Sequence, residues 1–219
     1  MLILALDTAT EAVTAAVLET AQDEVRSTVC VVGRAAHGER IGPVVEAALA
    51  QAGVVPTDLA AVGVGRGPGP YTGLRVGLAH AEVLGWALGI PVHGVCTLDV
   101  LAAGAVARGL AGEFLAVTDA RRREVYWARY APGGVRVEGP DVGRPDEVPG
   151  AGLPAVGTGA QRYPEHFPTP ALPQYPEAEV LARVVSERLA AGLPADVSPL
   201  YLRRPDAVPA TTRKRVTPR

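Results

Sequence analysis

Long apolar runs, paired cysteines and lysine are scarce in this chain of 219 residues, and these scarcities exclude several classes of protein. No apolar run approaches the roughly 18 residues that a membrane helix needs, so we expect no membrane span. Cys30 and Cys96 lie in apolar sequence without CxxC spacing, which predicts reduced core thiols, no disulfide and a cytoplasmic protein. The opening MLILALDTAT has no basic region and turns acidic at Asp7, which predicts a first strand and no signal peptide.

The motifs of common catalytic sites are also missing. A net charge of −2 gives no general argument for binding nucleic acid or membrane. Serine is scarce and no G-x-S-x-G occurs, so a serine-based triad has no support. His37 would need a second metal ligand three or four residues later, and Arg40 and Ile41 occupy those positions. We therefore predict no metal site and no catalytic residue.

Hydrophobic spacing predicts alternating strands and helices in the first half of the chain. A hairpin, a third strand and an amphipathic helix that stops at Gly53 come first, and two strands that alternate with two helices follow. The expected strands are 2–6, 12–18, 25–32, 59–65 and 90–95, and the expected helices are 39–52, 72–88 and 97–107.

The second half repeats the layout of the first in a reduced form. An apolar strand that runs to Asp119, a polar turn and another strand match the pattern around Asp7, which predicts two related lobes. Proline crowds residues 139–176, where we expect loops around one short strand at 153–159. A last helix is expected at 177–191, and 198–203 leads into the tail. We expect lobes at 1–107 and 108–203 and a flexible basic tail at 204–219.

The loop GVGRGPGPYTGLRVG, Gly63–Gly77, has two interpretations. Glycines before a helix offer backbone N–H groups to a phosphate, but the Walker positions for lysine and serine or threonine are not filled. The alternative, which we favour, is a rigid connector in which prolines fix the backbone and glycines allow close approach.

The segment LDTATE resembles the first phosphate loop of the actin-like fold. Asp7, Thr8 and Thr10 are the candidates for a vestigial phosphate loop, and the equally supported alternative is that they organise the hairpin turn. Two basic groups, Arg121–Arg123 and the tail residues Arg213, Lys214 and Arg215, could contact RNA or an acidic partner. Solvated surface charge is the interpretation that we favour for both.

Taken together, the stretches resemble the TsaB (YeaZ) family of bacterial tRNA threonylcarbamoyladenosine biosynthesis proteins. The matching stretches are LILALDTAT, HGERIGPVVEAAL, VGVGRGPGPYTGLRVGLAHAEVLGWALGIPVHGVCTLDVLA, TDARRREVYWARY and PLYLR. The resemblance covers Met1 to about Arg203, and G-P-G-x-[YF]-T-G-[LI]-R is its most specific element. It implies an α/β fold of the actin-like (ASKHA, ribonuclease H-like) kind, with two lobes of mixed sheets flanked by helices and the second lobe reduced.

The resemblance also implies a non-catalytic subunit without a cofactor. Its partners would be a paralogous TsaD-like transferase, which modifies the adenosine beside the anticodon of tRNAs that read ANN codons, and a TsaE-like ATPase. Transfer RNA would be contacted indirectly through the complex, and the chain alone would form a homodimer. A nucleotide-binding ATPase or small-molecule kinase of the same fold is the alternative, and a metallopeptidase fails for want of ligands.

In that family the two helices of the first lobe, here 37–52 and 72–88, form a four-helix contact with the partner. The small residues of the second helix would permit close approach and its leucines would fill the contact. The alternative is that the same residues face the lobe's own sheet. The predicted interface residues are His37, Arg40, Val44, Leu74, Gly77, Leu78, Ala81 and Gly85.

Overall fold

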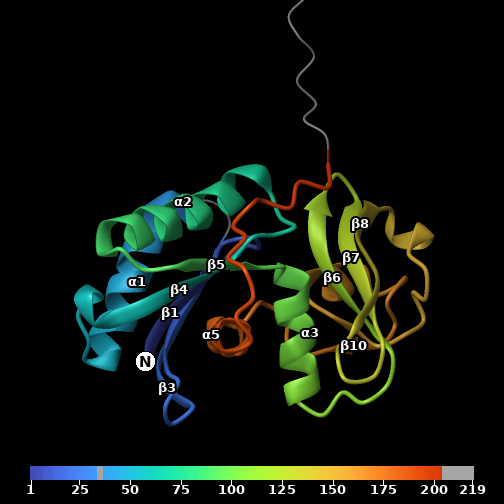
Figure 1. The fold of residues 1–219 in the computed structure, drawn as a ribbon. Helices are drawn as coiled ribbons and strands as arrows, with labels where there is room; N and C mark the ends of the chain where they lie inside the picture. The colour runs from blue at the N-terminus through green and yellow to red at the C-terminus, as the bar shows by residue number, and fades with distance from the viewer. Residues whose placement is uncertain (34–36, 204–219) are drawn as a thin grey trace, which may run out of the picture.

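The computed structural model describes residues 1–33 and 37–203, which form two lobes, each built on a five-stranded mixed sheet (Figure 1). In the first sheet the strand order is β3-β2-β1-β4-β5, with β2 antiparallel to β1 and β3, and β1, β4 and β5 parallel. Its strands are β1 Leu2–Asp7, β2 Ala12–Glu19, β3 Glu24–Val32, β4 Leu59–Gly65 and β5 Val92–Val95.

Two helices, α1 (His37–Ala52) and α2 (Tyr71–Leu88), cover one face of this sheet, and the short 3-10 helix η1 (Pro56–Asp58) follows α1. The apolar stripe of each helix packs on alternate residues of β1, β2 and β4, as the 3.6-residue period predicts. Gly85 lets α2 approach β5 closely, since a Cβ at this position would overlap the side chain of Val92.

The second sheet has the same strand order as the first, β8-β7-β6-β9-β10, with β6 in the place of β1. Its strands are β6 Phe114–Arg121, β7 Glu124–Tyr130, β8 Arg136–Gly143, β9 Ala155–Val156 and β10 Pro170–Ala171. The repeated layout inferred from the sequence is therefore confirmed at the level of topology.

The second lobe is reduced because its helices and last strands are short. Only the 3-10 helix η2 (Pro145–Glu147) stands between β8 and β9, where the first lobe has α1. The counterpart of α2 is α4 (Thr158–Arg162), with 5 residues against 18.

The expectation of loops around one short strand in the proline-rich stretch was wrong, because the end of β8, η2, β9, α4 and β10 all lie in it. β8 continues through Pro140, which an edge strand tolerates because its outer side needs no N–H donor. The expected strand at 153–159 is cut to β9, because Gly157 adopts a left-handed φ of 95° and α4 begins directly after it.

Helices α3 (Thr97–Ala107) and α5 (Ala178–Ala190) are in contact and lie between the two sheets (Figure 1). Each packs mainly on the sheet of the other half of the sequence: Leu98 and Leu101 of α3 join the core with Phe114, whereas Leu181 of α5 joins the core with Ile3. The lobe boundary at 107/108 stays a prediction, and the tail 204–219 lies outside the described residues.

The two cysteines differ in burial. Cys96 is buried at the start of α3, as expected, but the expectation of a core position for Cys30 was wrong. Cys30 is exposed and lies on β3, the edge strand of the first sheet. Both are free thiols, and no helix among the described residues is long and apolar enough to cross a membrane.

Because α5 belongs to the core of the first lobe, we predict that Leu181→Ala lowers the free energy of unfolding by about 2–5 kcal/mol. Leu181 is fully buried, whereas the control Leu193→Ala removes the same atoms from an exposed side chain and should change stability by less than about 0.5 kcal/mol. Urea unfolding measures both variants. Equal losses would contradict the packing described for α5.

Candidate functional site

Asp7 ends strand β1 in the interior of the first lobe, at the position of the acid in the suspected phosphate loop. Its Oδ1 accepts the N–H of Ala9 at 2.7 Å and its Oδ2 accepts the hydroxyl of Thr97 at 2.8 Å. Burial raises the pKa of Asp7 to about 6, although both hydrogen bonds act in the opposite direction. Gly65 lies against the carboxylate and leaves no space for a Cβ. The acid is thus enclosed by its own chain.

The hydroxyl of Thr8 fixes the beginning of α2. It donates to the carbonyl of Gly73 at 2.7 Å and accepts the N–H of Gly77 at 3.0 Å. A side chain at Gly77 would overlap this hydroxyl, so glycine is required for the contact. Thr8 therefore has both its donor and its acceptor capacity engaged inside the lobe.

Thr10 shapes the hairpin turn, as one of the two interpretations proposed. Its hydroxyl accepts the N–H of Ala12 at 3.2 Å. His37 Nε2 lies 2.8 Å from the carbonyl oxygen of Thr10, so the imidazole ties the beginning of α1 to this turn. Hydrogen bonds within the chain account for the side chains of Asp7, Thr8 and Thr10.

The glycine-rich loop packs against this turn as a connector. Gly69 lies directly on the carbonyl of Ala9 and has no space for a Cβ, and Gly67 adopts a left-handed φ of 88°. The carbonyl of Gly67 accepts the N–H of Thr97 at 2.7 Å, at the first turn of α3. The backbone that would wrap a phosphate is used to join α2, α3 and the hairpin.

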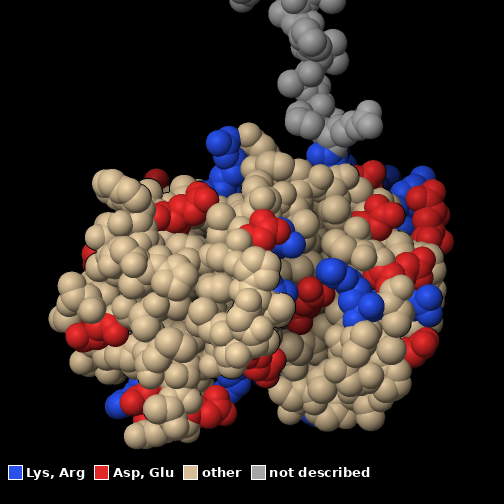
Figure 2. All heavy atoms as spheres, in the orientation of Figure 1, with Lys and Arg blue, Asp and Glu red and all other residues tan. Residues whose placement is uncertain are grey.

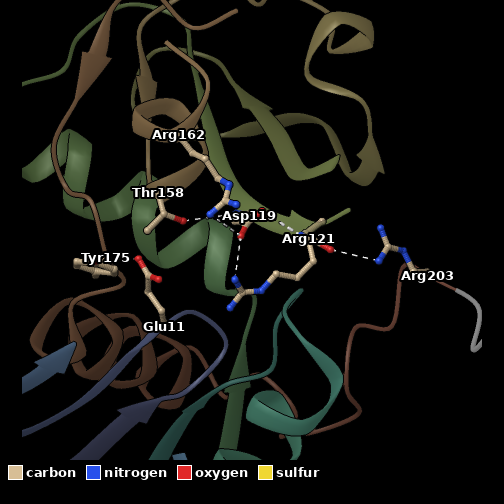
Figure 3. Close-up of polar contacts among 8 residues, drawn as sticks. Glu11, Asp119, Arg121, Thr158, Arg162, Tyr175 and Arg203 are labelled. Carbon is tan, nitrogen blue, oxygen red and sulfur yellow. Dashed lines mark hydrogen bonds and ion pairs between the residues drawn. The ribbon is translucent and has the colours of Figure 1, made fainter. Parts of the chain in front are cut away.

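Asp119 occupies the equivalent position at the end region of β6 in the second lobe (Figure 3). Its Oδ1 accepts the N–H of Arg121 at 3.0 Å, and its Oδ2 lies 3.4 Å from a guanidinium nitrogen of both Arg121 and Arg162. The arginine turn is therefore partly neutralised by its own lobe. Arg121, Arg122 and Arg123 all have positive φ, which L-residues with side chains adopt at a cost.

Little space remains where the two strand ends face each other. The cavity lined by Thr10, Glu11, Pro70, Asp119 and Arg121, among others, has a volume of about 20 Å³. A neighbouring hollow along Glu11, Thr158 and Arg162 measures about 200 Å³. Both are smaller than the roughly 300–1,000 Å³ typical of ligand pockets, so this cleft offers no space of nucleotide size.

The predicted interface residues of α1 and α2 lie mostly on the inner faces of these helices. Leu78 is 5% exposed and packs in the core of the first lobe. The same core includes Val44, Leu74 and Ala81, and Gly77 and Gly85 contact Thr8 and Val92 as described above. His37 and Arg40 are partly buried. The contribution of these residues to a partner contact stays a prediction.

The outer face of α2 carries large side chains that the sequence analysis did not single out. Trp86 is 86% exposed and Val83 is 65% exposed, one turn apart on the helix. Near the other end, the ring of Tyr71 lies 5.2 Å from that of Tyr201 and the Arg75 guanidinium lies 5.1 Å above the Tyr71 ring. The signal in the sequence was a tryptophan on the helix face opposite the glycines. We call Tyr71, Arg75, Val83 and Trp86 the outer α2 face.

Charged side chains are sparser over the first lobe than around the second in the view of Figure 2. Within the described residues, no group of three or more histidine, cysteine or acidic side chains lies close enough to bind a metal ion. The candidate site therefore consists of two features: a cleft with little free space between the ends of β1 and β6, and the exposed outer α2 face.

Comparison with known proteins shows which family this chain resembles. The family model described as TsaD, tRNA N6-adenosine threonylcarbamoyltransferase, matches residues 27–207. An uncharacterized protein of Mycobacterium tuberculosis is 48% identical over 209 residues, which is 94% of each chain. The Escherichia coli tRNA threonylcarbamoyladenosine biosynthesis protein TsaB is 41% identical over 130 residues, 59% of this chain and 55% of that protein. YeaZ from Pseudomonas aeruginosa has a TM-score of 0.76 and 32% identity, over 92% of this chain and 99% of that one.

This chain belongs to the TsaB/YeaZ family. The resemblance found in the sequence is confirmed, and so is the expected α/β fold of two lobes with mixed sheets flanked by helices and a reduced second lobe. A second Pseudomonas aeruginosa structure, described as similar to peptidase YEAZ, superposes with a TM-score of 0.79 over 92% of this chain. Both superpositions cover 92% of this chain, so the structural similarity extends over both lobes.

The raised pKa of Asp7 predicts a pH-dependent loss of stability. The folded protein holds the proton up to a pKa of about 6, whereas the ordinary value is 3.8, so the free energy of unfolding should fall as pH rises between these values. The total loss is about 3 kcal/mol relative to Asp7→Asn, since one pKa unit corresponds to about 1.4 kcal/mol.

Asp7→Asn is a suitable reference because an amide can accept from Ala9 and donate to Thr97. Urea unfolding of both proteins between pH 4 and pH 7 gives the difference in free energy at each pH. A difference that stays constant across this range would show that the carboxyl is not titrating with a raised pKa.

Proposed function

We propose that this TsaB/YeaZ-family chain is a non-catalytic, cytoplasmic subunit required for threonylcarbamoyl transfer to tRNA. It acts by binding a TsaD-like paralogous transferase, with a TsaE-like ATPase in the same complex and tRNA contacted through that complex. The main support comes from the hydrogen bonds at the end of β1. Asp7 and Thr8, the residues that would bind a phosphate or a metal ion, are hydrogen-bonded within their own chain. The biosynthetic assignment carried by the name of the Escherichia coli relative supports the pathway.

The outer α2 face supports the docking role. Large exposed aromatic side chains in an interface contribute most of the binding energy, and Trp86 is the most exposed large apolar residue described. Helix α1 lies beside α2, so a partner with the same helix pair could form a four-helix contact. The same surface can pair with itself, so we expect a homodimer when the partner is missing.

The direct experiment is co-purification with the paralogous transferase, followed by a tRNA-modification assay with and without this chain. We expect a stable complex and modification that depends on this subunit. Modification at full rate without the chain would overturn the proposal. Enzyme-like ATP hydrolysis by the isolated chain would favour the alternative of a nucleotide-using enzyme.

We predict that Val83→Glu and Trp86→Ala each weaken binding to the transferase by about tenfold or more, because both remove the large apolar side chains that this surface exposes most. Light scattering should also show a shift of the isolated chain from dimer towards monomer. Calorimetry or surface plasmon resonance gives the affinity for the transferase.

The matched control is Val137→Glu, because Val137 is 50% exposed on edge strand β8 of the other lobe. It should bind and dimerise as the unmodified chain does. Leu78→Glu does not test the interface, since a charge at this buried position would disrupt the core. If Val83→Glu and Val137→Glu behave alike, the outer α2 face is not the docking surface.

A further inference from the structure

A second hollow lies on the other face of the first sheet, away from α1 and α2. It has a volume of about 360 Å³, within the range of small-molecule pockets. Its floor is formed by Thr14 of β2 and by Thr28 and Cys30 of the edge strand β3. The opposite wall is the segment Leu172–Glu179, which enters α5 from the second lobe.

Thr14 is the residue of this hollow whose buried hydroxyl lacks a hydrogen-bond partner in the described part of the chain. It is 3% exposed. A buried hydroxyl without a partner is destabilising, so such groups are uncommon unless a water or a ligand completes them. Thr14 is paired directly with Cys30 across the strands, which places it beside the other polar groups of the floor.

The charge of the hollow is negative. Glu177 is engaged on both carboxylate oxygens by the guanidinium of Arg108. Glu179 accepts the hydroxyl of Thr28 at 3.0 Å, and no guanidinium among residues 1–33 and 37–203 forms an ion pair with it. Partial desolvation in the hollow, together with Glu179 and Glu177, raises the pKa of the Cys30 thiol, so this thiol stays neutral.

The rest of the lining includes apolar side chains and the ring of Tyr175. Leu172 and Pro173 present hydrocarbon surface, and Leu172 is exposed. Tyr175 lines the hollow, and its hydroxyl donates to Glu11 of the first lobe at 3.1 Å (Figure 3). The hollow thus combines one uncompensated carboxylate, one unsatisfied buried hydroxyl and an aliphatic wall.

We propose that this hollow binds a small aliphatic amine, whose ammonium group lies against Glu179 and whose hydrogen-bond donors reach the Thr14 hydroxyl. An anion would be repelled by Glu179, and the described residues place no cluster of three metal-ligating side chains here. Thr14 and Cys30 are directly opposite, about 5 Å apart, and Thr28 is about 7 Å further along β3, which suits a short diamine.

The site is independent of the proposed docking function. It lies on the α5 side of the first sheet, whereas the outer α2 face belongs to the opposite side. A bound amine would contact β2 and β3 of the first lobe and the segment Leu172–Glu179 of the second, so it would join the two halves of the molecule.

The test is calorimetric titration of the full chain with 1,4-diaminobutane, with neutral 1,4-butanediol as the matched control compound. We expect saturable binding of the diamine and none of the diol. Amide shifts in ¹H–¹⁵N spectra should be largest at Thr14, Thr28 and Cys30. Glu179→Gln should weaken binding about tenfold or more, and Thr14→Val about fivefold, because charge-assisted hydrogen bonds are the stronger class.

Glu187→Gln is the control variant, since it removes the same charge from an exposed position about 12 Å further along α5. Its affinity should stay within about twofold of the unmodified chain. Thr14→Val keeps the shape of the side chain and loses an unpartnered hydroxyl, so thermal unfolding should find it folded. Absence of saturable binding, equal effects of the two Glu→Gln changes, or an unchanged affinity of Thr14→Val would each overturn the proposal.

Discussion

The structure depends on the hydrogen bonds that the polar side chains at the end of β1 form within their own chain. Asp7 binds the first turn of α3 through Thr97, and Thr8 binds the first turns of α2 through Gly73 and Gly77. One strand end thus fixes two helices and the glycine-rich loop between them. In a fold whose ligands commonly lie at strand ends, these hydrogen bonds use the groups that a ligand would need.

The second lobe shows what the same topology becomes without that constraint. Its strand order equals that of the first lobe, and Asp119 stands where Asp7 stands. Asp119, however, lies near the surface beside Arg121 and Arg162, and the helix that follows β9 has only 5 residues. The lobe keeps its sheet because α3, which comes from the first half of the sequence, covers one face with Leu98 and Leu101.

Much of the fold could be predicted from the sequence, because period and glycine stops are local signals. The first-lobe strands and α1, α2 and α3 were placed to within a few residues. Other features depend on partners distant in sequence. Pro140 is compatible with a strand only at a sheet edge, and Cys30 lies on an edge strand where it lines an open hollow. Likewise, the spacing of Leu74 and Leu78 shows that they share a face but not whether that face meets the sheet or a partner.

The glycines of α2 show how the inner face of this helix packs on the sheet of its own lobe. Gly77 and Gly85 let the helix lie close to Thr8 and Val92, so the leucines of the same stripe pack in the core of their own lobe. A helix buried this deeply on one side leaves its opposite stripe as the part that solvent or a partner can reach. That stripe contains Val83 and Trp86, and apolar side chains of this size are unfavourable in water unless something covers them. Close packing within the lobe and the exposed apolar stripe on the opposite side of α2 are therefore two consequences of the same pair of glycines.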